Sequence, residues 1–113
     1  MILAVIGLGS MGKRRIRLLK RYIEALHGAD ANWGIVGIDM QEERCEECRS
    51  LFEIETCNSI QDAASRYNIE AAVISTSPLS HGSIISQCLD LNLHVFTEIN
   101  LVLDYYDNNI PFQ

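Results

Sequence analysis

Long apolar runs are missing from this sequence of 113 residues. No apolar run approaches the length of roughly 20 residues that is needed to span a bilayer. The N-terminus has no basic stretch ahead of its first apolar run, and that run is too short for a secretory signal peptide. We therefore interpret Met1 as the true start and expect a cytoplasmic protein with no membrane partner. Repeats, low-complexity tracts and linkers are also missing, so we expect one domain with one core.

Positive charge is scarce. The formal net charge of −6 argues against a general nucleic-acid binder, because such proteins carry a basic face. Six of the nine basic residues lie between Lys13 and Arg21, and six glutamates lie between Glu42 and Glu55. We interpret the basic cluster as a solvated helix surface. Lys13 and Arg14 are near enough to the glycine-rich turn that precedes them to favour a phosphate there.

The sequence also lacks a complete set of zinc ligands. Cys45 and Cys48 form a C-x-x-C motif in a helical-looking segment, so both would lie on one helix face. No second ligand pair accompanies them at a suitable spacing, so we expect no metal. We interpret all four cysteines, including Cys57 and Cys88, as reduced cytosolic thiols that are partly buried as small apolar groups.

The N-terminus carries the most informative pattern. An apolar run leads directly into the Gly-x-Gly-x-x-Gly motif of residues 7–12, and a basic, helix-forming segment follows from 13 to 26. Gly7 permits a sharp exit from the strand, Gly9 lets a pyrophosphate approach the backbone, and Gly12 lets the helix pack close to the strand. The free N–H groups and the dipole at the helix start favour an anion.

Apolar segments alternate with helical segments along the rest of the chain. This alternation predicts an α/β fold with a parallel sheet covered on both faces, and right-handed crossovers give the doubly wound strand order 3-2-1-4-5. The alternating acids of the third strand are typical of a sheet edge. The expected strands are 2–6, 34–39, 53–57, 70–75 and 93–98. The first expected helix is 13–26, which stops at Gly28 and has an apolar stripe made of Met11, Ile16, Leu19, Tyr22, Ile23 and Leu26. The second is 41–52. The third has Ser59 as its N-cap and ends at Tyr67, and the fourth has Ser80 as its N-cap and ends at Leu91.

Such a sheet binds ligands beyond the carboxyl ends of its strands, at the switch point between strands 1 and 4. The turn 7–12, Asp39-Met40 and the loop Thr76 to His81 should meet there. Asp39 lies 27 positions after Gly12, where a carboxylate can accept both ribose hydroxyls of an adenosine and repel a 2′-phosphate. NAD is therefore favoured over NADP. The alternatives are that Asp39 is an ordinary strand-end residue and that His81 only fills a surface at a helix start.

These motifs together resemble the N-terminal half of the Gfo/Idh/MocA oxidoreductase family, over nearly the whole chain and in the family's order. The likeness rests on Gly-Leu-Gly-Ser-Met-Gly-Lys-Arg-Arg, Asp39, the loop from Ser75 to His81, and His94-Val95-Phe96-Thr97-Glu98. Members are NAD(P)-dependent oxidoreductases, mostly of sugars, polyols and sugar nucleotides. They join this Rossmann domain to a C-terminal α+β substrate domain. The resemblance implies a cofactor site made of Gly7, Leu8, Gly9, Ser10, Met11, Gly12, Asp39, Thr76, Ser77, Pro78, His81 and Glu98.

Two segments depart from the family pattern. The family loop after strand 4 commonly reads Thr-Pro-Asn-x-x-His, whereas this chain has Ser77 and Pro78 where Pro and Asn are usual. Backbone contacts could survive this change, but a contact from the Asn side chain could not. The family's Glu-Lys-Pro signature is matched by Glu98 but continues with Ile99, in place of a lysine that normally lies near the nicotinamide. Isoleucine has no proton to offer, so we expect no catalytic residue here.

The chain stops at Gln113, before the family's substrate domain. We therefore expect one dinucleotide-binding domain over residues 1–113, incomplete at its C-terminal sheet edge, that binds NAD without turning over a sugar by itself. An apolar surface near 101–110 would favour self-association or a partner. The alternative is a non-catalytic NAD-sensing or partner-binding module. A methyltransferase, which also uses a glycine-rich turn and a strand-2 acid, is disfavoured by Gly12 and the segment His94 to Glu98.

Overall fold

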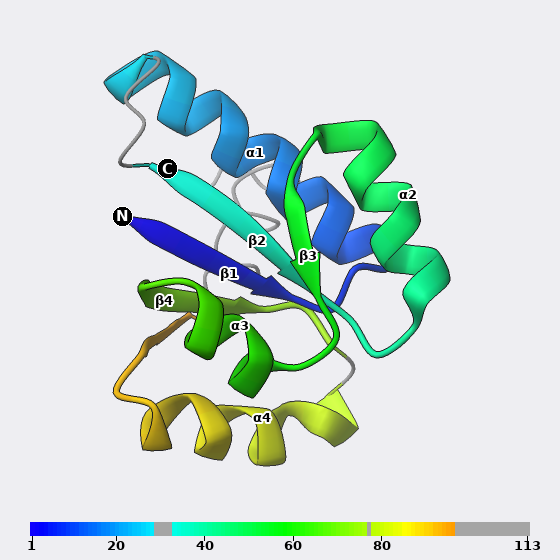
Figure 1. The fold of residues 1–113 in the computed structure, drawn as a ribbon, viewed down its shortest axis with the longest axis vertical. Helices are drawn as coiled ribbons and strands as arrows, with labels where there is room; N and C mark the ends of the chain where they lie inside the picture. The colour runs from blue at the N-terminus through cyan, green and yellow to red at the C-terminus, as the bar shows by residue number, and fades with distance from the viewer. Residues whose placement is uncertain (29–32, 77, 97–113) are drawn as a thin grey trace, which may run out of the picture.

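The computed structural model describes residues 1–28, 33–76 and 78–96, with the backbone alone at 27 and 78–81. These residues form a five-stranded parallel sheet with helices on both faces (Figure 1). No helix in these ranges is long and apolar enough to cross a membrane. The elements are β1 (Ile2–Ile6), α1 (Ser10–His27), β2 (Gly34–Ile38), α2 (Glu42–Phe52), β3 (Glu55–Cys57), α3 (Ile60–Arg66), β4 (Ile69–Ile74), α4 (Pro78–Asp90) and β5 (His94–Phe96).

The strand order is β3-β2-β1-β4-β5, which confirms the predicted doubly wound topology. The central strand β1 pairs with β2 from Ile2↔Gly34 to Ile6↔Ile38, and with β4 on its other side. Strands β3 and β5 are the edges of the described sheet, as the acids in the third strand predicted for β3. Because helices cover both faces, the central strands are apolar along almost their whole length.

Alternate residues of each strand pack into two separate cores. On one face, Val5 and Val73 pack with Ile16 of α1 and with Cys45, Cys48 and Phe52 of α2. On the other face, strand residues such as Ala4 and Ile74 pack with α3 and α4, whose buried contributions are Ile60, Ala63 and Cys88. All four cysteines are buried free thiols, in agreement with their interpretation as small apolar groups.

Within the described residues, element boundaries agree with the predicted ones to within three residues. Gly28 ends α1 at φ 60°, and the Ser59 hydroxyl accepts a hydrogen bond from the Asp62 amide at 3.1 Å, as predicted. Helix α4 begins at Pro78, so the prediction that Ser80 caps it is wrong. Proline suits the first turn of a helix because its missing N–H has no intrahelical acceptor there. The predicted continuation of the fifth strand through Glu98 lies outside the described residues.

The predicted apolar stripe of α1 is only half right. Ile16 is buried and Leu19 is half-buried, but Tyr22 and Leu26 are 58% and 59% exposed. An 18-residue helix is about 27 Å long, whereas the five-residue β1 spans only about 16 Å. The last turns of α1 therefore extend past the sheet (Figure 1), and the side chains of Tyr22 and Leu26 have no core to pack against.

The basic residues of α1 are not simply a solvated surface, because three of them contact α2. Lys13 forms an ion pair with Glu47. The Arg17 guanidinium lies 5.4 Å from the centre of the Phe52 ring, and Lys20 donates a hydrogen bond to the Phe52 carbonyl at the end of α2. The same cluster also contains Arg15, which is only 5% exposed. Three basic side chains of α1 thus help to pack this helix against α2.

Candidate functional site

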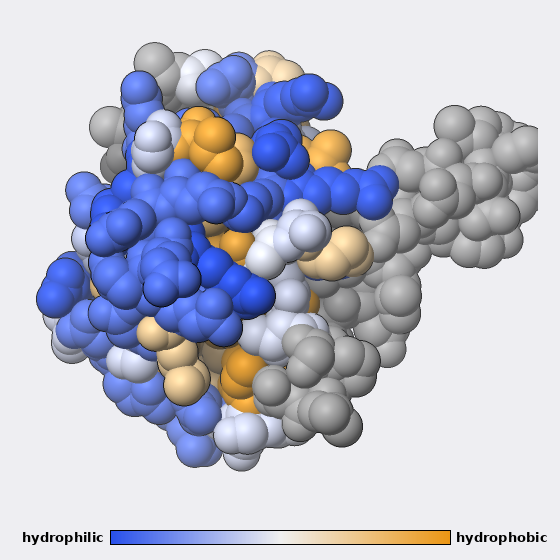
Figure 2. Space-filling model, turned by 90° about the vertical axis from the view of Figure 1, so that its right-hand side faces the viewer, coloured by the Kyte–Doolittle hydropathy of each residue, from blue (hydrophilic) through white to orange (hydrophobic). Residues whose placement is uncertain are grey.

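A cleft of about 690 Å³ lies at the carboxyl ends of the central strands. Strands β1 and β4 are neighbours there, but their following helices cover opposite faces of the sheet, which makes this the topological switch point. Figure 2 looks onto this side of the molecule, where apolar patches show between hydrophilic side chains. The lining residues are Ile6, Gly7, Gly9, Ser10, Met11, Ile38, Asp39, Met40, Gln41, Arg44, Asn58, Ser59, Ile60, Ser75, Thr76, Ile84 and Gln87.

Two glycines of the turn between β1 and α1 are required by packing. Gly7 has φ +96°, and a Cβ on it would lie 2.9 Å from the carbonyl carbon and oxygen of Ser75. A Cβ on Gly12 would lie 1.8 Å from the Gly7 carbonyl oxygen, which no side chain can tolerate. Gly9 differs, because its Cβ would meet only the Arg44 guanidinium, at an ordinary 3.7 Å. The missing side chain of Gly9 therefore leaves room in the cleft.

The start of α1 points unpaired donors at the cleft. Gly9 is the N-cap, no side chain caps the helix, and its first turn contains no acidic residue. Because the first amides of a helix have no intrahelical acceptor, this end carries partial positive charge. Gly9, Ser10 and Met11 line the cleft at this point. The arrangement suits an anion such as a phosphate.

Asp39 joins the end of β2 to this turn. Its Oδ2 accepts a hydrogen bond from the Leu8 amide at 2.9 Å, and its Oδ1 accepts one from the Gln41 amide at 2.8 Å. The Arg44 guanidinium contacts Oδ2 at 3.5 Å. The side chain is 8% exposed, so most of the carboxylate faces protein donors. Its backbone carbonyl also accepts a hydrogen bond from Asn58 Nδ2 at 3.1 Å.

The charged side chains near the cleft are largely paired. Lys13, which we predicted would favour a phosphate, is paired with Glu47, and neither Lys13 nor Arg14 is among the lining residues. Hydrogen bonds from Arg49 and Asn58 lower the pKa of Glu42 at the start of α2. Burial raises the pKa of the Cys45 thiol behind Asp39, and the nearby Glu42 carboxylate adds to the effect. The helix start and Arg44 are thus positive groups beside Asp39, the predicted ribose acceptor.

The predicted site residues fall into four groups. Gly7, Gly9, Ser10, Met11, Asp39 and Thr76 come together in the cleft. Leu8 and Gly12 lie behind the turn: Leu8 is fully buried in the core, and Gly12 contacts the Gly7 carbonyl. Pro78 and His81 belong to the first turns of α4, where the structure describes the backbone alone. Ser77 and Glu98 lie outside the described residues.

Sequence reasoning missed several residues of the cleft. Gln41 and Arg44, from the start of α2, were missed, whereas Met40, which the sequence placed at this site with Asp39, lines the cleft and is 89% exposed. Ser75 follows β4, and its buried hydroxyl has no hydrogen-bond partner among the described residues. No sequence motif predicts the remaining lining residues, because they reach the cleft only through the packing of α3 and α4. These residues are Asn58, Ser59, Ile60, Ile84 and Gln87.

The sequence model of one family, described as "Oxidoreductase family, NAD-binding Rossmann fold", matches residues 1–107. The chain belongs to the Gfo/Idh/MocA oxidoreductase family. This confirms the resemblance seen in the sequence, and NAD is the cofactor named in the family's description, as predicted. A search of curated proteins finds no match to the chain.

Solved structures of this oxidoreductase type share the fold. The WlbA dehydrogenase from Chromobacterium violaceum, in complex with NADH and UDP-GlcNAcA, has a TM-score of 0.70 at 12% identity over 84% of this chain and 26% of its own. GenD2 from gentamicin A biosynthesis, in complex with NAD, has a TM-score of 0.69 at 20% identity, covering 84% and 25%. The myo-inositol 2-dehydrogenase from Lactobacillus plantarum has a TM-score of 0.66 at 22% identity, covering 84% and 26%.

At these identities the likeness concerns the fold of the Gfo/Idh/MocA domain alone. The chain spans about a quarter of the length of each of these solved proteins. The family match over residues 1–107 includes all five described strands and all the residues that line the cleft.

Proposed function

We propose that residues 1–113 form a dinucleotide-binding domain whose cleft binds NAD, with the pyrophosphate at the start of α1 and the adenosine ribose at Asp39. The observation that carries this proposal is the hydrogen bond from the Leu8 amide to the Asp39 carboxylate. It holds a ribose acceptor directly beside the anion-binding turn. Exposed Met40, the next residue, offers an apolar surface for the adenine.

NAD when bound would supply a hydride acceptor, and the residues of this chain would bind and orient it. The amides at the start of α1 would hold the pyrophosphate, and Asp39 would receive ribose hydroxyls. The space left by Gly9 would let the diphosphate approach the backbone. The buried Ser75 hydroxyl, at the end of β4, is a further polar group beside the turn.

We propose further that these residues bind the dinucleotide without transferring hydride to a sugar by themselves. Ile99 replaces the lysine of the family signature, and an isoleucine side chain has no donor for a reacting hydroxyl. Joined to a substrate domain like those of its relatives, the domain would act on a sugar, polyol or sugar nucleotide. UDP-GlcNAcA in the WlbA structure and inositol in the name of the Lactobacillus enzyme support this substrate class. Buried free thiols suit the reducing cytoplasm.

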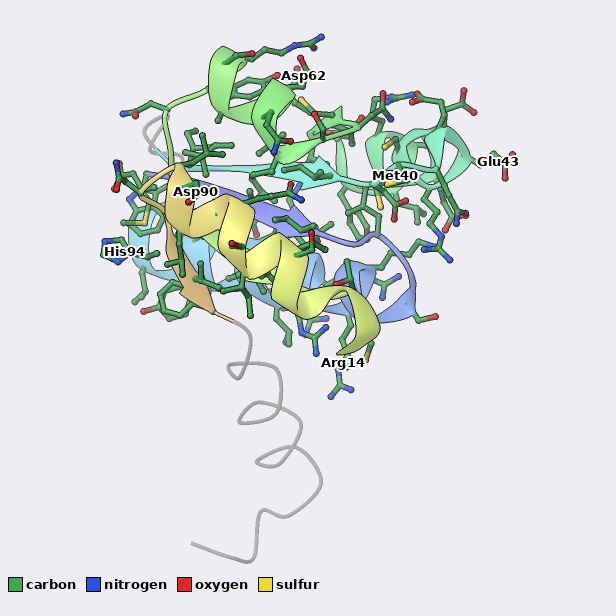
Figure 3. The ribbon with its side chains drawn as sticks, turned by 90° about the horizontal axis from the view of Figure 1, so that it is seen from below. Arg14, Met40, Glu43, Asp62, Asp90 and His94 are labelled. Carbon is green, nitrogen blue, oxygen red and sulfur yellow. The ribbon has the colours of Figure 1, made fainter. Side chains whose placement is uncertain are left out.

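Calorimetric titration with NAD tests the binding proposal. We expect saturable binding to the wild-type chain and weaker binding to Asp39→Asn, which keeps the shape of the side chain but loses its charge. Asp90→Asn is the matched control, because Asp90 lies at the end of α4. Figure 3 shows it at the opposite end of the molecule from Met40, which lines the cleft. No heat with NAD, or equal losses in both variants, would contradict the proposal.

A panel of sugars, polyols and sugar nucleotides, assayed by NADH absorbance, tests the second part. We expect that neither the 113-residue chain nor any of its cofactor-site variants transfers hydride to a panel member. Turnover of any panel member by this chain alone would contradict the proposal. The binding measurement is independent of this assay, so either part can fail without the other.

A partner-binding role is a second candidate, favoured by one observation. Phe96 on the edge strand β5 is 44% exposed, although strand residues of this type are usually buried. An apolar side chain on a sheet edge favours self-association or a partner. Sedimentation of the chain with and without NAD distinguishes this role, because a strict monomer in both states would count against it.

A further inference from the structure

The lining of the cleft combines apolar side chains with carboxamides. Met40, which is 89% exposed, follows the proposed ribose acceptor, and Ile60 of α3 and Ile84 of α4 line the same cleft. The carboxamides of the lining are those of Gln41, Asn58 and Gln87. A heteroaromatic base has flat apolar faces and a polar edge, so this lining suits the adenine of the proposed dinucleotide.

Two of these carboxamides are poorly suited to recognising a base. Gln87 is already engaged, because its Oε1 accepts a hydrogen bond from Gln61 Nε2 at 3.0 Å and its Nε2 donates one to the Ser83 hydroxyl at 3.3 Å. The Gln41 side chain is exposed, and no hydrogen bond within the described residues fixes which of its amide atoms would face a base. Asn58 differs from both.

The Asn58 side chain is held in one orientation. It follows β3, and its Nδ2 donates one hydrogen bond to the Asp39 carbonyl and one to Glu42 Oε2, each at 3.1 Å. The Cys45 sulfur lies 3.8 Å from the same nitrogen, and Arg49 holds Glu42 in place through a 2.8 Å contact to Oε1. Because a carbonyl and a carboxylate oxygen can only accept, the amide nitrogen must face both, and both of its N–H groups are used.

Asn58 Oδ1 is the polar atom of this side chain that is left for a ligand. No donor in the described part of the chain contacts it, and Asn58 is an exposed residue of the cleft lining. An amide oxygen only accepts hydrogen bonds, so it favours a base with an amino group over a base with an oxygen at the same position. Adenine carries an amino group at position 6, whereas hypoxanthine carries an oxygen there. The orientation of Asn58 therefore distinguishes two bases of nearly the same shape.

We propose that Asn58 is a specificity-determining residue that selects adenine, because its Oδ1 accepts a hydrogen bond from the 6-amino group. This inference rests on the proposed function, which places the adenosine beside Asp39 and Met40. Asn58 also supports the Asp39 backbone, so its loss should weaken the binding of every dinucleotide. The ratio of two dissociation constants separates the two roles, since a displaced loop affects both ligands and only the hydrogen bond distinguishes their bases.

The test compares NAD with nicotinamide hypoxanthine dinucleotide, which has an oxygen in place of the 6-amino group and a hydrogen on N1. Calorimetric titrations of the wild-type chain, Asn58→Ala and Asn68→Ala give the ratio Kd(hypoxanthine dinucleotide)/Kd(NAD) for each, and thermal unfolding verifies each fold. Asn68 is the matched control because it is exposed, precedes β4 at the end of that strand away from the cleft, and is not a lining residue. In the wild-type chain we expect a ratio of about 3 to 10, the value of one neutral hydrogen bond.

The two variants fix the interpretation. Asn58→Ala should bring the ratio to about 1, because no acceptor remains to discriminate, and Asn68→Ala should keep the wild-type ratio. A wild-type ratio of about 1, or a raised ratio that Asn58→Ala leaves unchanged, would overturn the inference and leave NAD binding intact. The wild-type ratio needs no variant, so it tests the inference even if Asn58→Ala unfolds. A wild-type chain that binds neither dinucleotide would overturn the proposed function, and this inference with it.

Discussion

The Asp39 carboxylate accepts a hydrogen bond from the Leu8 amide at 2.9 Å, across 31 residues of sequence. The contact ties the end of β2 to the glycine-rich turn, so the two halves of the proposed ribose and pyrophosphate site keep a fixed separation. It also means that the acid has a structural role before any ligand binds. Loss of this side chain should therefore lower stability as well as affinity.

We expect Asp39→Ala to lower the free energy of unfolding by about 1–3 kcal/mol, because the Leu8 and Gln41 amides lose a partly buried acceptor. Urea unfolding followed by circular dichroism measures this change. Asp90→Ala, an exposed aspartate on α4, should change stability little. Equal stabilities of the two variants would show that water replaces the lost acceptor.

Gly12→Ala should destabilise the fold by more than about 2 kcal/mol, because the new Cβ would lie 1.8 Å from the Gly7 carbonyl oxygen. Gly82→Ala is the matched control: Gly82 lies inside α4 with nothing within 4 Å of the new methyl group. That variant should gain about 0.5–1 kcal/mol from helix propensity. Thermal unfolding of both checks the prediction, which a stable Gly12→Ala chain would contradict.

The fold could be predicted from the sequence because its signals are local. The glycine spacing, the strand-end Asp39 and the capping Ser59 each report a geometry that depends on few neighbours. The cleft was less predictable, because Ile84 and Gln87 reach it only through the packing of α4 on the other face of the sheet. The exposed Tyr22 shows the same limit, since its periodicity indicates burial but the sheet ends before it.

Ser75→Ala should leave the ligand-free chain as stable as wild type or slightly more stable. Its hydroxyl is buried without a hydrogen-bond partner among the described residues, so removing it relieves a desolvation cost of about 1 kcal/mol. If the hydroxyl serves the proposed dinucleotide, NAD affinity should fall at the same time. Paired unfolding and calorimetric titrations measure both quantities. A clear loss of stability would show instead that the hydroxyl supports the fold.

The cysteines should react slowly with iodoacetamide in the native state. Burial raises the pKa of Cys45, Cys48, Cys57 and Cys88, so each has less thiolate at a given pH than a free cysteine, and each is also shielded from the reagent. Mass spectrometry after brief alkylation at pH 8 should find the native chain unmodified and the urea-unfolded chain fully modified. Rapid alkylation of any thiol in the native chain would indicate local opening of its core.

Glu42 gives the chain a pH-dependent contribution to stability. Hydrogen bonds from Arg49 and Asn58 lower its pKa in the folded state, so the unfolded state binds a proton first as pH falls. The contribution is therefore complete above the ordinary glutamate pKa and is lost as pH falls through the lowered folded value. Glu42→Gln should be less stable than wild type at neutral pH, and the difference should vanish in acid. Glu43→Gln is the control, because the Glu43 side chain points away from the ribbon in Figure 3. Urea midpoints at both pH values measure these differences, and a Glu42→Gln deficit that persists in acid would contradict the linkage.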